Sequence, residues 1–228
     1  MIHHYGDRPS QHGELVIPEG EPRGVVVVIH GGFWKAAYGL ELGRPLAADL
    51  VARGWVSWNL EYRRVGDGGG VPATFDDVAA GIDLLADLGL DLSKVVTLGH
   101  SAGGHLATWA ASRGGVTAVV SQAGVLDLWS AYADGLGGGA VGALLGHAPS
   151  EADDGHDPLR QVPLDVPVWC VHAPDDDTVP ISQSRAYVAA ARAAGGRATL
   201  VEVPGDHYSV IDPESEAWAL TVGILERL

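Results

Sequence analysis

Three separate segments of the sequence carry side chains that could act together on a carbonyl group. Ser101 lies in the pentapeptide Gly99-His100-Ser101-Ala102-Gly103, the aspartates at positions 175–177 follow it, and His207 lies near the C-terminal end. In this order a serine, an acid and a histidine can form a triad, in which the histidine removes the serine proton and the carboxylate orients the histidine. The chemistry expected of them is acyl transfer through a covalent acyl-serine.

The serine pentapeptide lies where a strand should turn into a helix. The apolar residues Val95 to Leu98 precede it, and a helical pattern through Leu106 and Trp109 follows it. Glycines two positions to either side of the serine permit the tight turn, and the start of the helix brings amide hydrogens close to the hydroxyl. We therefore assign Ser101 as the nucleophile.

The acid and the base each follow a predicted strand. Val168 to Val171 leads into the three aspartates, and Leu200 to Val203 leads into His207. We assign His207 as the general base, because it occupies the expected position after the last strand. Asp176 is the favoured acid, since Asp-x-x-Val-Pro is the spacing expected after this strand, and Asp177 is the alternative.

A glycine-containing loop, His30-Gly31-Gly32-Phe33-Trp34, supplies candidates for binding the oxyanion. Acyl transfer needs amide hydrogens aimed at the carbonyl oxygen as it gains negative charge, and glycines let the backbone turn these groups inward. The expected donors are the amides of Gly32, Phe33 and Ala102. His30 should organise the loop through hydrogen bonds. Trp34 has two interpretations, as a residue lining the substrate pocket or as an aromatic that packs the loop onto the core.

The other histidines and the one cysteine suggest no second site. His105, four residues after Ser101, should pack beneath the site, and His172 should hydrogen-bond to the backbone. The remaining histidines lack the spacing of zinc ligands, so no metal is predicted, and acyl transfer requires no cofactor. Cys170, the only cysteine, is expected to be a small buried hydrophobe within a strand.

Short apolar runs alternate with helical patterns along most of the chain. Val25 to Ile29 is apolar at every position, as expected of a central parallel strand covered on both faces. The alternation predicts βαβ units, and so a mostly parallel sheet with helices on both faces. The other expected strands are Gly13–Pro18, Trp55–Leu60, Val95–Leu98, Val116–Ser121, Val166–Val171 and Ala198–Val203. The expected helices are Leu40–Arg53, Pro72–Leu85, one through Leu106 and Trp109, Ser182–Ala194 and Glu214–Leu228.

The 228 residues suit one domain with a full core. The exception to the alternating pattern is the segment Leu126 to Pro163, rich in Gly, Asp and Pro, with one short helical stretch near Val141 to Leu145. Loops of this length are usually functional or mobile. We therefore expect a single domain, 1–228, with a small cap or lid at about 126–163. The alternative is an insertion without a catalytic role.

Charge and composition limit the partners. A formal net charge of −15 argues against nucleic acid and anionic membranes, because both need a basic face. The longest apolar run, Val25 to Ile29, is too short to cross a bilayer. Met1 to Asp7 has neither a basic nor an apolar region of a secretory signal, and a lone cysteine forms no intrachain disulfide, so a cytoplasmic location is expected. The expected partner is a small ester or amide, and a homodimer is compatible with the sequence.

Together, these motifs resemble the α/β-hydrolase superfamily, and the resemblance extends from the leading strand to the closing helix. The His-Gly-Gly-Phe-Trp loop and the segment Gly-His-Ser-Ala-Gly-Gly-His-Leu, residues 99–106, are similar to kynurenine formamidases and related small carboxylesterases. The resemblance implies hydrolysis of a small carboxylic ester or of an aryl formamide, N-formylkynurenine, without a cofactor. Two alternatives remain: a small peptidase of the prolyl-oligopeptidase type, and a non-catalytic module that binds a small ligand on the same scaffold.

Overall fold

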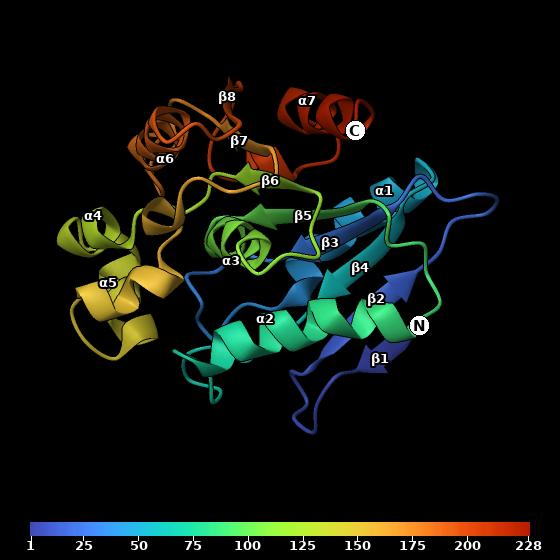
Figure 1. Cartoon of the computed structure of the whole chain (residues 1–228), viewed down its shortest axis with the longest axis horizontal. Coiled ribbons are helices and arrows are strands. Elements are labelled where there is room, and N and C mark those ends of the chain that lie inside the picture. Colours follow the sequence, from blue (N-terminus) through green and yellow to red (C-terminus); the bar gives the residue numbers. More distant parts are fainter.

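The computed structural model describes all 228 residues, and an eight-stranded sheet runs through the molecule (Figure 1). The strand order is β1-β2-β4-β3-β5-β6-β7-β8; the first two strands are antiparallel to their neighbours and the other six are parallel to one another. This confirms the predicted fold class. The strands are β1 (Ile2–His4), β2 (His12–Val16), β3 (Val25–Ile29), β4 (Val56–Leu60), β5 (Val95–His100), β6 (Ala118–Gln122), β7 (Val168–His172) and β8 (Ala198–Glu202).

Helices cover both faces of the sheet, and each face has its own apolar core. In β3, Val25 and Val27 contribute to one core, while Val26 and Val28 contribute to the other, as the two-residue period of a strand requires. The core on the first face includes residues of α2 (Ala73–Asp83), α3 (Ala102–Ala111) and α6 (Ser182–Ala193). The core on the second face includes residues of α1 (Arg44–Ala52) and α7 (Glu216–Leu225).

The segment 126–163 is more regular than the sequence predicts. It holds α4 (Leu128–Ala133), α5 (Leu136–Leu145) and two 3₁₀ helices, Glu151–His156 and Pro158–Gln161. The Asp127 carboxylate caps α4 by accepting hydrogen bonds from the amides of Trp129 and Ser130. Three of the glycines that make the sequence look irregular here, Gly137, Gly138 and Gly139, have left-handed backbone angles at the start of α5, a conformation that favours glycine.

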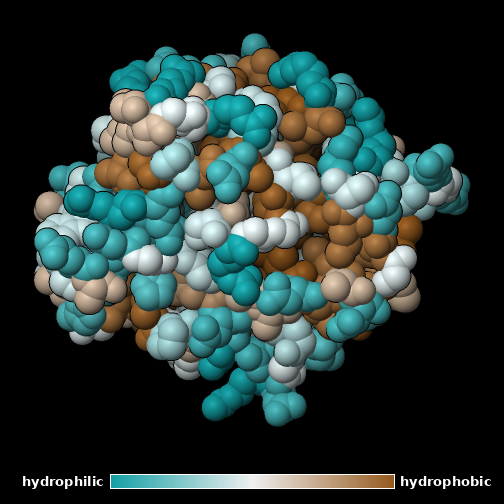
Figure 2. Space-filling view, viewed as in Figure 1, coloured by the Kyte–Doolittle hydropathy of each residue, from teal (hydrophilic) through white to brown (hydrophobic).

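This helical segment lies near the carboxyl ends of the parallel strands (Figure 1). The side chain of Gln183, at the start of α6, fixes its beginning: Oε1 accepts from the amides of Leu126 and Asp127, and Nε2 donates to Ser130. Hydrophilic residues cover most of the molecular face in Figure 2, and apolar residues are visible mainly in its upper and right-hand parts. None of the helices has the length and apolar character needed to cross a membrane.

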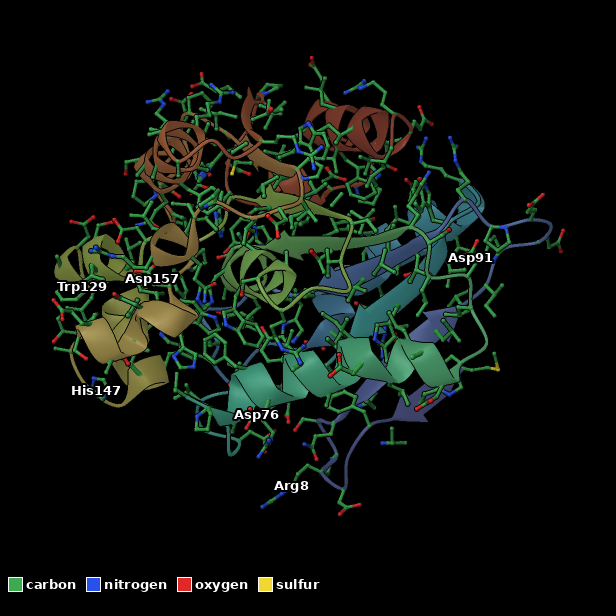
Figure 3. The ribbon with its side chains drawn as sticks, in the orientation of Figure 1. Arg8, Asp76, Asp91, Trp129, His147 and Asp157 are labelled. Atoms are coloured by element: carbon green, nitrogen blue, oxygen red, sulfur yellow. The ribbon has the colours of Figure 1, made fainter.

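A buried carboxylate makes the stability of this segment sensitive to pH. Asp157 lies among its helices (Figure 3), almost fully buried, and accepts hydrogen bonds from the amides of Leu128 and Leu159. Burial, together with the nearby Asp127, raises the pKa of Asp157 to about 7. Because the folded pKa exceeds the unfolded pKa, the folded state binds more protons, and the free energy of unfolding should fall as pH rises between the two values.

We therefore expect the free energy of unfolding to fall by about 2–4 kcal/mol more in the parent protein than in Asp157→Asn between pH 4 and pH 8. Asparagine does not ionise, so the variant lacks this contribution to the pH slope. Urea titrations at several pH values would measure the difference. Parallel slopes for the two proteins would contradict the assignment.

Candidate active site

Ser101 is the residue at which β5 turns into α3. Its backbone angles, φ 55° and ψ −118°, lie in a region that residues other than glycine seldom adopt. The turn is possible because Gly103 lacks a side chain: a Cβ atom there would lie 2.0 Å from the carbonyl oxygen of Ile29. The serine amide is bonded to the Gln122 carbonyl of the next strand, which fixes the turn to the sheet. This is the strained strand-to-helix turn that the sequence predicts.

His207 follows β8, and Asp176 follows β7, the adjacent strand. Nδ1 of His207 lies 2.7 Å from Oδ2 of Asp176, and both side chains are buried. No hydrogen bond in the protein occupies Nε2 of His207, and His207 and Ser101 line the same cavity. A carboxylate on Nδ1 favours the tautomer whose Nε2 can accept a proton.

Asp176 is held by four donors. Its Oδ1 accepts hydrogen bonds from the amides of Thr178 and Val179, at 2.9 and 2.8 Å, while Oδ2 is also 3.2 Å from Nε2 of His172. Burial alone would raise the pKa of Asp176, but the hydrogen bonds from His172, His207 and Val179 outweigh it and hold the pKa well below its usual range. The carboxylate is therefore ionised next to His207 at neutral pH.

The other two aspartates of the triplet do not reach His207. Asp175 and Asp177 are both exposed, and Oδ1 of Asp177 accepts a hydrogen bond from the Thr178 hydroxyl. Of the two candidates for the acid, the structure brings only Asp176 to the histidine.

The loop after β3 lies against the serine turn. A Cβ atom on Gly31 would lie 3.1 Å from Cβ of Ser101, and Gly32 and Phe33 line the same cavity as Ser101. The amides of Gly32, Phe33 and Ala102 donate to no backbone carbonyl. All three predicted oxyanion donors are thus free of backbone partners, and their residues lie beside or next in sequence to the serine.

A buried polar cluster supports this loop. His30 Nε2 lies 2.9 Å from Oε1 of Glu61, and the His30 ring stacks on Tyr62 with centroids 4.4 Å apart. The Tyr62 hydroxyl donates a 2.8 Å hydrogen bond to the His30 carbonyl. The expectation that His30 organises the loop agrees with these contacts.

Trp34 and His105 lie beneath the loop. The rings meet edge to face with centroids 5.1 Å apart, and Trp34 is only 1% exposed. Trp34 is absent from the lining of the cavity at Ser101, so the geometry favours packing over substrate contact. His105 is fully buried, contacts the His156 carbonyl through Nε2, and burial lowers its pKa to about 4, so it is neutral.

The cavity at the serine is small and open to solvent. Its volume is about 100 Å³, below the roughly 300–1,000 Å³ of sites that enclose drug-sized ligands. Two exposed tyrosines, Tyr38 and Tyr208, stand at its walls; Tyr208 directly follows the predicted base, whereas no sequence signal points to Tyr38. The remaining lining residues are His100, which belongs to the serine pentapeptide, and Leu42, Thr178 and Ile211.

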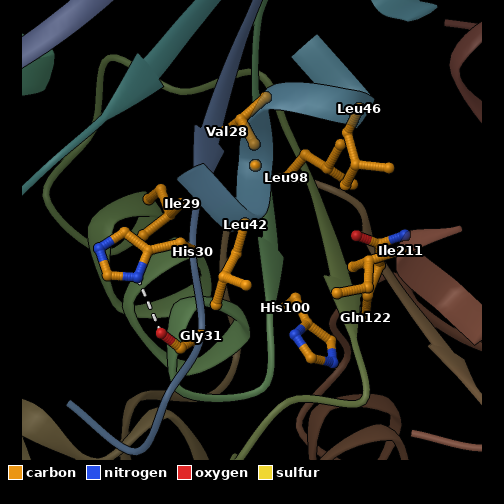
Figure 4. Close-up of a pocket in the computed structure, with 11 residues that line it drawn as sticks. Val28, Ile29, His30, Gly31, Leu42, Leu46, Leu98, His100, Gln122 and Ile211 are labelled. Carbon is orange, nitrogen blue, oxygen red and sulfur yellow. Dashed lines mark hydrogen bonds between the residues drawn. The ribbon is translucent and has the colours of Figure 1, made fainter. Parts of the chain in front are cut away.

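His100, the residue before the nucleophile, ties the serine turn to the histidine loop. Nε2 of His100 lies 2.9 Å from the carbonyl oxygen of His207, and the two rings are 4.5 Å apart. Burial and the neighbouring His207 lower the pKa of His100 to about 3, so its ring is neutral and Nε2 donates this bond. Figure 4 shows the ring at the edge of a second, much smaller cavity behind the site, with Gln122 and Ile211 nearby.

Comparisons with known proteins show which family and which fold the chain shares. Residues 15–190 match the model of the BD-FAE family, a range that includes Ser101 and Asp176 and ends before His207. A probable isoprenylcysteine alpha-carbonyl methylesterase, ICMEL1 of Arabidopsis thaliana, is 24% identical over 90% of this chain and 50% of its own length. Esterase LipQ of Mycobacterium tuberculosis is 26% identical over 81% of this chain and 50% of its own length. The chain thus spans about half the length of these curated relatives.

Solved structures share the fold. A thermophilic esterase from Thermogutta terrifontis has a TM-score of 0.80 at 22% identity, covering 100% of this chain and 90% of its own. A phosphonate-inhibited esterase B from Lactobacillus rhamnosis has a TM-score of 0.84 at 24% identity, covering 99% and 83%. At these identities the similarity establishes a common architecture.

Proposed function

Because the chain belongs to the BD-FAE family and has the α/β-hydrolase fold, we propose that it is a serine esterase that cleaves small carboxylic esters through an acyl-serine intermediate. One observation carries the proposal: Ser101, on its strained turn, shares a cavity with His207, whose Nδ1 is held 2.7 Å from a buried, ionised Asp176. The names of the curated relatives, a methylesterase and an esterase, support the same reaction.

In the proposed mechanism, Nε2 of His207 accepts the Ser101 proton as the serine oxygen attacks the ester carbonyl. The amides of Gly32, Phe33 and Ala102 stabilise the tetrahedral oxyanion. His207 then gives the proton to the leaving alcohol, and the acyl-serine remains. A water molecule, deprotonated by the same histidine, attacks the acyl-serine and releases the carboxylic acid.

The cavity supports a small acyl group with a leaving group that extends toward solvent. Its volume of about 100 Å³ is too small to enclose a large substrate. Tyr208, which lines the cavity, is 63% exposed, and its ring meets the ring of His207 edge to face with centroids 5.3 Å apart. Hydrolysis of an aryl formamide is the alternative reaction, and the motif resemblance is its basis.

A cytoplasmic location, a homodimer and a single domain with a cap also stay predictions.

Labelling with a fluorophosphonate probe, combined with a paired assay, tests the proposal. The expected result is covalent labelling at Ser101, together with hydrolysis of a short-chain aryl ester. A parallel assay of N-formylkynurenine compares kcat/KM for the formamide with kcat/KM for the aryl ester. A peptide amide tests for peptidase activity. A folded protein that neither reacts with the probe nor cleaves any of these substrates would be a binding module instead.

A further inference from the structure

One contact outside the three loops of the site joins Phe33 to the helical segment 126–163. Gly137 lies against the Phe33 ring, so closely that a Cβ atom on Gly137 would come within 2.5 Å of ring atom Cδ1. The Lys35 ammonium lies 5.8 Å from the centre of the same ring and donates a 2.6 Å hydrogen bond to the Gly137 carbonyl. We refer to Phe33, Lys35 and Gly137 together as the Phe33 clamp.

Phe33 is a residue that needs external support. Its φ is 50°, and that of the following Trp34 is 56°, both in the left-handed region that side chains other than glycine adopt at a cost. Such conformations persist where surrounding contacts hold them. Phe33 also lines the cavity at Ser101, and its amide donates to no backbone carbonyl. Movement of its ring would therefore move a candidate oxyanion donor.

We propose that Gly137 and Lys35 are positioning residues that hold the Phe33 amide in line with the oxyanion. This inference rests on the proposed esterase function, because only an esterase reaction gives the position of the Phe33 amide a catalytic consequence. It also assigns a role to the segment 126–163, which reaches the site through this clamp. Phe33 needs a residue without a side chain at position 137, because the ring fills the space that a methyl group would take.

The chain offers a closely matched control for Gly137. Gly138 has nearly the same backbone conformation, with φ 67° against 60°, yet a Cβ atom there would meet nothing within 4 Å. Gly137→Ala and Gly138→Ala therefore introduce the same left-handed alanine, and only the first displaces the Phe33 ring. We expect Gly137→Ala to lower kcat on a short ester about tenfold, less than the roughly 10²–10³-fold cost of losing one donor outright. KM should change by less than about threefold, and Gly138→Ala should keep the parent kcat.

Two substitutions of Lys35 test its part in the Phe33 clamp. Lys35→Met removes both the hydrogen bond to Gly137 and the cation near the ring, and it should lower kcat severalfold. Lys35→Arg keeps a cation and a donor, and it should recover most of the loss. If Lys35 only stabilised the fold, the melting temperature would fall together with kcat. Both quantities are therefore measured on every variant.

An NMR measurement separates this proposal from the proposed function. The amide signal of Phe33 should shift in Gly137→Ala and stay near its parent position in Gly138→Ala, whether or not the protein cleaves esters. An unmoved Phe33 signal in Gly137→Ala, or equal losses of kcat in the two alanine variants, would overturn the clamp. If the Phe33 signal shifts in Gly137→Ala but the parent protein neither hydrolyses esters nor reacts with fluorophosphonate, the clamp stands and the esterase proposal alone is removed.

Discussion

Ser101→Ala is expected to reduce kcat on a short aryl ester by roughly 10⁴- to 10⁶-fold, to the level left by substrate binding and the oxyanion amides. The variant lacks the oxygen that attacks the carbonyl, and no other hydroxyl is available on the turn, since Ala102 follows it. Fluorophosphonate labelling should disappear with the activity. Steady-state kinetics and intact-mass measurement of the labelled protein check both expectations.

The fold should survive this substitution. Alanine already occurs with a positive φ in this protein, because Ala123 has φ 48°. Melting curves should therefore be similar for the parent and for Ser101→Ala. Ser112→Ala is a suitable control: its hydroxyl donates to the Trp109 carbonyl at the end of α3, away from the cavity, and its loss should leave kcat unchanged. Turnover near the parent rate in Ser101→Ala would remove the serine from the mechanism.

The parts of the fold that the sequence predicts well are those with strong local signals. β3 is apolar at all five positions and is buried at all five, as a strand between two helical layers must be. The positions of the turns after β3, β5, β7 and β8 follow from these strands, and so do the positions of the loops that carry the site. β1 is not predictable in this way, because three residues, of which Ile2 is largely exposed, produce no periodic signal.

The helices α4 and α5 show why composition misleads in the segment 126–163. The glycines of α5 lower its helix propensity, but tertiary contacts determine the structure of the segment: Gln183 of α6 fixes its start, and Phe33 packs on Gly137. Neither contact is local in the sequence. The wall residue Tyr38 escapes sequence-based detection for the same reason, since only the fold brings it to the cavity at Ser101.

The choice of the acid among three consecutive aspartates depends on the direction of each carboxylate, which the sequence does not specify. In the structure this direction follows from local turns: the amides of Thr178 and Val179 hold Oδ1 of Asp176, which turns Oδ2 toward His207. The spacing argument favours the same residue, but the physical reason lies in the conformation of the loop.

Asp176→Asn is expected to lower kcat roughly 10⁴-fold, and Asp177→Asn to change it by less than about threefold. The two amides that bond to Oδ1 of Asp176 require an oxygen at that position, so the asparagine side chain of the first variant must present its NH₂ group toward His207. This group donates a hydrogen bond, so it stabilises the tautomer of His207 that has its proton on Nε2. That nitrogen can then no longer accept the proton of Ser101.

The comparison is informative because the two substitutions are chemically identical and adjacent in sequence. Asp177 is exposed and its carboxylate contacts only the Thr178 hydroxyl, so its neutralisation tests the general effect of removing one negative charge near the site. Measuring kcat and the melting temperature for both variants separates lost catalysis from lost stability. Equal rates for the two variants would mean that neither Asp176 nor Asp177 alone orients His207. A larger loss in Asp177→Asn would mean that the loop rearranges before the reaction, bringing Asp177 to the histidine in place of Asp176.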